Sequence, residues 1–134
     1  MPYWQCYYHV VWGTKGRQPM ITPQREPLIF DTIRQVTEEV GGHVWAVNGI
    51  VNHVHVAVSI PPRLSVAVWV KRCKGASSRY VNQASAPDNP FKWQAGYGVF
   101  TFGKKALRWV VAYIDNQKHH HADGTTHPDL ETME

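Results

Sequence analysis

Two histidines, His53 and His55, stand two positions apart within residues 52–59, a stretch in which valines alternate with other side chains. This alternation is typical of a β-strand with one buried face. Because successive side chains of a strand point to opposite faces, both imidazoles should lie on one face, opposite the valines. Two imidazoles held side by side on a rigid strand are able to bind one metal ion. The same pattern, taken alone, also fits an ordinary half-buried strand.

A second pair with useful chemistry, Tyr113 and Gln117, lies in a predicted helix over residues 104–119. The apolar stripe of this helix consists of Leu107, Val110, Val111 and Ile114. Residues four apart on a helix lie one above the other, so the pair can offer a nucleophile and an oxygen ligand to one site. His121 would extend this row if the helix continued. However, the run of three histidines that contains it is explained by the preference of helix ends for cationic residues.

The rest of the pattern predicts the elements that must position these two pairs. We expect strands at residues 5–13, 43–51, 52–59 and the end of 91–102, and helices at 22–40, 64–83 and 104–119. The side chains of Val44, Ala46 and Asn48 should share one strand face, and the short connection at Asn52 favours an antiparallel hairpin. The order β-α-β-β-α-β-α predicts an α+β fold. It is a ferredoxin-like (RRM-like) antiparallel sheet with packed helices and an extra C-terminal helix that carries Tyr113.

The chain of 134 residues fits a single domain, which we assign to residues 1–121, followed by a polar and loose tail at 122–134. Its net charge of +4 leans towards a polyanionic partner without deciding it. The two cysteines, Cys6 and Cys73, match no metal or redox spacing and indicate a reducing compartment. No signal peptide and no membrane-spanning apolar run is visible, so we expect a cytoplasmic protein with no membrane partner.

These residues resemble the motifs of a known family. His53-Val54-His55 matches the His-hydrophobic-His motif of HUH endonucleases, and Tyr113 with Gln117 matches the Tyr-x-x-x-Gln motif of single-tyrosine TnpA transposases. Further likeness is carried by Asn52, by residues 71–79 and by the Trp-Gln-x-Gly-Tyr-Gly-x-Phe stretch at 93–100. A lone His-x-His is a weak signal, but both motifs in this order on this fold pattern are strong. The chain therefore resembles a short transposase of the insertion-sequence-200 type over residues 3–121.

The resemblance implies cleavage and rejoining of single-stranded DNA at insertion-sequence ends. Tyr113 would attack a phosphodiester and become linked to the 5′ phosphate, and His53, His55 and Gln117 would hold a divalent ion that polarises the phosphate. Such a mixed ligand set suits Mg²⁺ or Mn²⁺, although imidazole alone would favour zinc or nickel. The resemblance also implies a DNA hairpin as substrate. It further implies a homodimer in which the tyrosine helix often serves the other subunit, so placement in cis or in trans stays open.

Basic side chains are the candidate DNA contacts. They lie in the loop before the first predicted helix, on one side of the second, and at the start of the third: Lys15, Arg17, Lys71, Lys74, Arg79, Lys104 and Lys105. Exposed aromatics such as Trp93 or Tyr97 would stack on unpaired bases. Taken alone, each basic cluster fits a solvated surface about as well as a phosphate contact.

Two other functions remain open at this point. One is a different HUH nicking enzyme, a relaxase or a replication initiator, although the short chain leaves no room for a helicase or a large origin-binding domain. The other is a catalytically silent ferredoxin-like module that binds RNA or DNA, against which the presence of His53, His55, Tyr113 and Gln117 argues.

Overall fold

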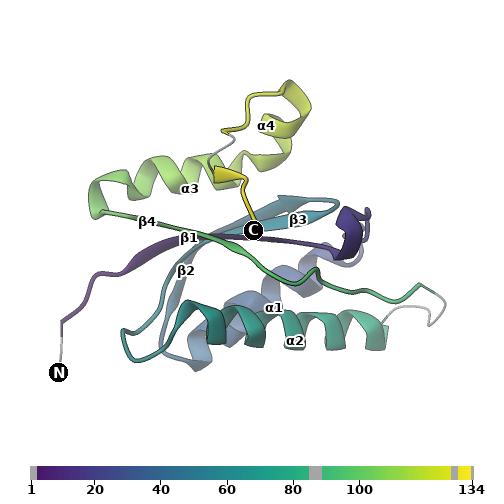
Figure 1. Cartoon of the computed structure of the whole chain (residues 1–134), viewed down its shortest axis with the longest axis horizontal. Helices are drawn as coiled ribbons and strands as arrows, with labels where there is room; N and C mark the ends of the chain where they lie inside the picture. Colours follow the sequence, from purple (N-terminus) through teal and green to yellow (C-terminus); the bar gives the residue numbers. More distant parts are fainter. Residues whose placement is uncertain (1–2, 85–88, 128–129, 134) are drawn as a thin grey trace.

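A computed structural model of the chain describes residues 3–84, 89–127 and 130–133. Four antiparallel strands form one sheet in the order β2-β3-β1-β4. Two helices, α1 and α2, cover one face of the sheet, while α3 and α4 lie on the other (Figure 1). Strand β3, which carries the two histidines, is therefore an inner strand enclosed from both sides.

The elements follow the predicted order. Their bounds are β1 Tyr7–Gly13, α1 Glu26–Glu39, β2 His43–Ile50, β3 His53–Ser59, α2 Val66–Ala84, β4 Gly98–Phe102, α3 Leu107–Asp115 and α4 Gln117–Asp123, with short 3-10 turns η1 Lys15–Arg17 and η2 Lys104–Ala106. This arrangement confirms the ferredoxin-like α+β fold, with the additional helical segment at the C-terminal end divided into α3 and α4. No helix in the described ranges is long and apolar enough to cross a membrane.

The main core lies between the sheet and the pair α1–α2. The valines of β3 that alternate with its histidines are completely buried in it, as the strand pattern predicts. Trp12 of β1 meets Trp69 of α2 edge to face, with ring centroids 5.7 Å apart. The indole N–H of Trp69 donates to the hydroxyl of Thr37 at 2.9 Å, so the buried polar edge of this large side chain is satisfied. This core fixes the back of β3 and so holds its opposite face still.

A smaller cluster packs α3 onto the other face through Ala46, Ala57, Val110 and Ile114. The prediction that Val44 shares a face with Ala46 is wrong. The β2–β3 register shifts between these two residues, and this irregularity directs Val44 into the main core and Ala46 towards α3. A single inserted residue reverses the alternation, which a strict period of two cannot anticipate.

Candidate active site

His53 and His55 point from β3 into the layer between the sheet and α3–α4. Both are almost completely buried, at 1% and 0% exposure, and their ring centroids lie 5.0 Å apart. The sheet therefore presents two adjacent imidazoles on one face, as the sequence predicts.

Asn52 orients the ring of His53. Its Oδ1 lies 2.8 Å from Nδ1 of His53, and because an amide oxygen only accepts, that nitrogen must carry the proton. The backbone carbonyl of Asn52 is in turn held by the N–H and hydroxyl of Thr14, at 2.9 and 3.2 Å. Nε2 of His53 is thus the ring nitrogen that faces the site; it is buried, makes no hydrogen bond of good geometry among the described residues and lies 3.2 Å from Oε1 of Glu131. An oriented imidazole nitrogen of this kind is what a metal ion requires.

His9 supports His55 from the neighbouring strand β1. Its Nε2 lies 2.8 Å from Nδ1 of His55, so the two rings share one proton. Burial, followed by the neighbouring His55, lowers the pKa of His9 to about 3. Burial likewise lowers the pKa of His55, against an opposing effect of the Glu131 carboxylate. Both rings are therefore neutral at physiological pH, the state in which histidine binds metals. The sequence pattern did not single out His9.

Tyr113 and Gln117 reach this same place, but not on one continuous helix. The predicted helix over 104–119 is wrong in this respect, because Asn116 interrupts it and α4 begins at Gln117. Both side chains remain buried, at 3% and 0% exposure. The side-chain oxygen of Gln117 lies 3.1 Å from Nε2 of His121. One chain thus contains both halves of the candidate site, and Tyr113 lies 6.2 Å from His55 between ring centroids.

Two residues that sequence analysis did not assign to the site complete it. The Nε2 atoms of His53, His55 and His121 lie 3.2, 3.0 and 3.3 Å from Oε1 of Glu131. The ligand atoms of these four residues all fall within 4.8 Å of one another, so the group could hold a metal ion. His121 could have been found, since it continues the row of Tyr113 and Gln117 at intervals of four. No sequence signal marked Glu131.

The expectation of a loose tail after residue 121 is therefore wrong for the part that the structure describes. Residues 122 and 123 still belong to α4, and segment 130–133 packs against the site. Residues 128, 129 and 134 of the predicted tail lie outside the described residues.

The phenol of Tyr113 is held in one orientation. Its ring stacks on Trp109 and on His120, at centroid distances of 5.6 and 4.7 Å. Its hydroxyl donates to Oε2 of Glu131 at 2.5 Å and accepts the backbone N–H of His127 at 2.9 Å. Burial, together with the Glu131 carboxylate, raises the pKa of Tyr113 to about 12. In this arrangement the phenol stays protonated.

Glu131 is ionised despite being half-buried. Burial alone would raise its pKa, but the side chains of His53, His55 and Tyr113 outweigh that effect and hold the pKa well below its usual range. The site therefore contains one carboxylate charge, between three imidazoles and a phenol.

The basic candidates are spread over several elements. Lys15 and Arg17 lie exposed on η1, and Lys104 and Lys105 lie exposed on η2 before the helix that carries Tyr113. Lys71 is exposed on α2. The remaining two are engaged by their neighbours.

Lys74 on α2 donates to the carbonyl oxygens of Gln94 and Gly96 at 2.8 and 2.7 Å, and burial lowers its pKa. It therefore anchors the 94–96 loop. The guanidinium of Arg79 lies over the ring of Tyr80, 5.2 Å from its centroid.

Trp93 is not the exposed stacking platform that the sequence suggests. It packs edge to face against Trp12 and Phe91, at centroid distances of 6.0 and 4.7 Å, and its N–H donates to the hydroxyl of Ser77 at 2.9 Å. Tyr97 is also partly buried against the main core. Both rings stabilise the path that leads into β4.

The position of Asn52 leads to a first prediction. Replacing Asn52 with alanine removes the acceptor that fixes the His53 tautomer, so the affinity for Mn²⁺ should fall by about 10–100-fold while the fold is retained. Isothermal titration calorimetry measures this. Asn82→Ala on α2 provides a control for loss of a side-chain amide elsewhere; Mn²⁺ affinity unchanged in Asn52→Ala would contradict the orienting role.

Comparisons with known proteins assign the class. The sequence profile of the family described as "Transposase IS200 like" matches residues 2–117. The transposase for insertion sequence element IS200 of Salmonella typhimurium is 28% identical over 120 residues, which cover 85% of this chain and 78% of that one. The ISDra2 transposase TnpA of Deinococcus radiodurans is 24% identical over 119 residues, covering 85% of each chain.

Solved structures agree on the fold. The crystal structure of a candidate transposase from Deinococcus radiodurans R1 superposes with a TM-score of 0.68 at 25% identity, covering 87% of this chain and 95% of the other. A REP-associated tyrosine transposase bound to a REP hairpin gives a TM-score of 0.65 at 14% identity, covering 94% and 76%. The fold and the His-x-His and Tyr-x-x-x-Gln motifs thus define a single-tyrosine transposase, which confirms the resemblance. The chain belongs to the IS200-like transposase family.

Proposed function

We propose that this protein cleaves and rejoins single-stranded DNA at the ends of an insertion sequence through a covalent 5′-phosphotyrosine link, assisted by a divalent metal ion. One observation carries the proposal. The hydroxyl of Tyr113 and the Nε2 atoms of His53 and His55 converge on the two oxygens of a single carboxylate, that of Glu131. A nucleophile and a set of metal-type donors facing one small anionic group is the arrangement that attack on a phosphodiester requires.

In the proposed step, the phenolic oxygen of Tyr113 attacks phosphorus and forms a new P–O bond. The bond between phosphorus and the bridging O3′ breaks, O3′ leaves and is protonated to a free hydroxyl, and the phenol proton passes to water. The phosphate stays attached to the 5′ carbon of the downstream strand. Because the phosphotyrosine bond conserves the energy of the cleaved bond, a later attack by a 3′ hydroxyl reverses the step and rejoins DNA without ATP.

The residues of the chain contribute orientation and charge control. Trp109 and His120 hold the Tyr113 ring by stacking, so the oxygen is fixed before the strand arrives. His53 and His55, with Gln117 and His121 beside them, are the groups proposed to hold Mg²⁺ or Mn²⁺. When bound, such an ion withdraws charge from the phosphate. A site this rich in imidazole should bind Mn²⁺ more tightly than Mg²⁺.

The proposed substrate is a DNA strand that folds into a hairpin near the element end. The fold-level likeness to a transposase bound to a REP hairpin supports this, as does the net charge of +4. Of the basic candidates, exposed Lys15, Arg17, Lys71, Lys104 and Lys105 are available for phosphate contacts. We further propose a homodimer acting in the cytoplasm, as family membership suggests.

The test is incubation with single-stranded DNA from the flanks of its own gene, in Mg²⁺ or Mn²⁺. We expect a protein–DNA adduct that survives a denaturing gel and that disappears when a chelator is added first. Cleaved DNA without any adduct would contradict the phosphotyrosine step. An adduct formed equally well in chelator would contradict metal assistance.

A further inference from the structure

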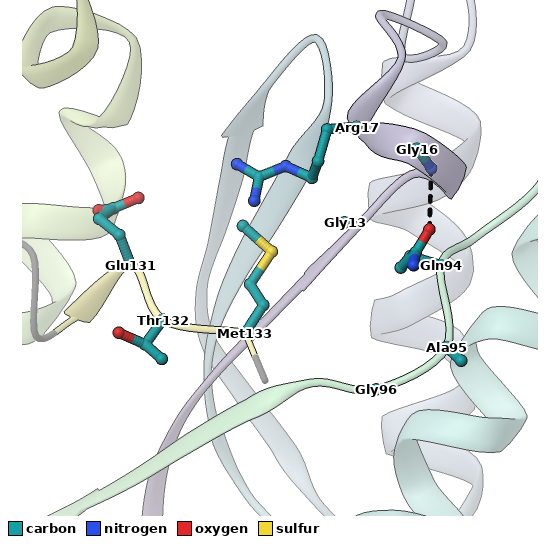
Figure 2. A pocket seen from close by; sticks show the side chains of 9 residues that line it. All are labelled: Gly13, Gly16, Arg17, Gln94, Ala95, Gly96, Glu131, Thr132 and Met133. Carbon is teal, nitrogen blue, oxygen red and sulfur yellow. Dashed lines mark hydrogen bonds between the residues drawn. The ribbon is translucent and has the colours of Figure 1, made fainter.

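Segment 130–133 carries Glu131 into the candidate site and leads away from it along a groove with few side chains. Figure 2 shows the segment passing from Glu131, beside the helices, to Met133, between β1 and the 94–96 loop. A pocket of about 360 Å³ lies beside the segment. Opposite the segment, its lining residues are Gly13, Gly16, Arg17, Gln94, Ala95 and Gly96. We call this groove, with the adjoining Gly98, the glycine trough.

We propose that the glycine trough is the channel for the single-stranded DNA next to the scissile phosphate, and that segment 130–133 is a built-in competitor whose Glu131 carboxylate occupies the position of that phosphate. The inference rests on the proposed function and concerns the regulation and substrate path of the same site.

The two carboxylate oxygens of Glu131 face different groups, as the oxygens of a scissile phosphate would have to. Oε1 faces the histidine nitrogens at 3.0–3.3 Å, and Oε2 accepts the hydroxyl of Tyr113 at 2.5 Å with the amide nitrogen of Gln117 at 3.5 Å. A phosphodiester attacked by Tyr113 needs its phosphorus within about 3–3.5 Å of the phenolic oxygen and its free oxygens towards the metal donors. The Glu131 carboxylate and the DNA phosphate are both anions that would contact the same side chains, so the site can hold only one of them at a time.

Glycines make room for a backbone along the trough. A Cβ atom added to Gly98 would collide with the carbonyl oxygen of Thr132, and one added to Gly13 would lie 3.1 Å from the sulfur of Met133. Gly96, with φ of +91°, would place a Cβ 3.6 Å from the carbonyl oxygen of Met133. A surface without side chains lets the main-chain atoms of another segment approach closely. The backbone of a nucleic acid strand would need the same space.

The charges beside the trough favour a polyanion. The Arg17 side chain extends from η1 over the trough near Met133 (Figure 2), and its guanidinium forms no ion pair with any described residue. Lys15 precedes it on the same exposed turn. These cationic side chains have no favourable charge interaction with the thioether of Met133, whereas they would have one with the phosphates of a DNA strand.

The test compares Glu131→Ala with Asp123→Asn, which removes one negative charge from exposed α4 without touching the trough. The probe is a fluorescein-labelled hairpin DNA from the flank of the gene, carrying the single strand that crosses the cleavage position. Binding is measured by anisotropy in chelator, so that no metal and no chemistry contribute. We expect Glu131→Ala to bind this probe about tenfold more tightly than wild type and more tightly than Asp123→Asn. The same hairpin without the flanking strand should bind all three proteins alike.

A second change examines the trough itself. Adding Gly98→Ala to Glu131→Ala places a methyl group on the floor and should reverse most of the gain for the stranded probe only. Adduct formation in Mn²⁺ should rise in Glu131→Ala in parallel with binding.

If Glu131→Ala behaves like Asp123→Asn, the segment does not compete and the inference is overturned. If Glu131→Ala instead binds Mn²⁺ and DNA more weakly than wild type, Glu131 is a resident metal ligand and the inference is equally overturned. Neither result contradicts the proposed function, which is tested by adduct formation in the wild-type protein.

Discussion

Tyr113→Phe is expected to bind a DNA hairpin with wild-type affinity and to form no covalent adduct. The substitution removes only the phenolic oxygen, because the ring keeps its stacking on Trp109 and His120. The loss of the hydrogen bonds to Glu131 and from His127 should cost stability by about 1–2 kcal/mol. Because the substitution removes the proposed attacking atom, cleavage should fall by at least about 10³-fold. A denaturing gel measures the adduct and anisotropy measures binding.

Tyr80→Phe is the matched control for this change. Tyr80 lies half-exposed on α2, on the other side of the sheet, and phenylalanine keeps the ring beneath Arg79. The control should form adduct at the wild-type rate. An adduct that persists in Tyr113→Phe would show that another residue attacks the phosphate, and the assignment of Tyr113 would have to be abandoned.

The parts of the site that sequence could predict are those held by local periodicity. His53 and His55 share a face because strand side chains alternate, and the valines between them commit the other face to the core. Tyr113 and Gln117 are four positions apart, and their alignment survives the break at Asn116 because α4 begins directly at Gln117. The sheet order follows from the same patterns, since strand–helix alternation with one hairpin leaves few arrangements.

The parts that sequence could not predict depend on contacts between distant segments. His9 reaches His55 only because β1 pairs with β3, which aligns His9 opposite Ala57 and brings its ring beside the neighbouring imidazole. Glu131 reaches the site from beyond α4, and only the three-dimensional path of that segment gives its carboxylate a partner. The shift between Val44 and Ala46 is likewise a property of the β2–β3 pair, and neither strand's own composition encodes it.

His53→Leu is expected to abolish adduct formation while leaving the protein as stable as wild type. Nε2 of His53 is buried and makes no hydrogen bond of good geometry among the described residues, although Oε1 of Glu131 lies 3.2 Å away; a poorly satisfied buried polar atom costs roughly 1–3 kcal/mol in the absence of a metal ion. Leucine has similar bulk and removes this penalty, which offsets the loss of the hydrogen bond to Asn52 and of the contact with Glu131. A side chain that lowers stability where it stands is retained for its chemistry. Mn²⁺ affinity should fall by more than the roughly 10–100-fold expected for Asn52→Ala.

Thermal unfolding in chelator and titration with Mn²⁺ separate the two effects. His119→Leu is the control, because His119 is exposed on the same helix as His121 and forms an ion pair with Asp123. It should leave Mn²⁺ affinity and adduct formation unchanged. If His53→Leu unfolds several degrees below wild type yet binds Mn²⁺ normally, the histidine serves the fold and not the metal. If its melting temperature equals that of wild type while Mn²⁺ binding and adduct formation are both lost, Nε2 of His53 is a metal ligand that does not contribute to folding stability.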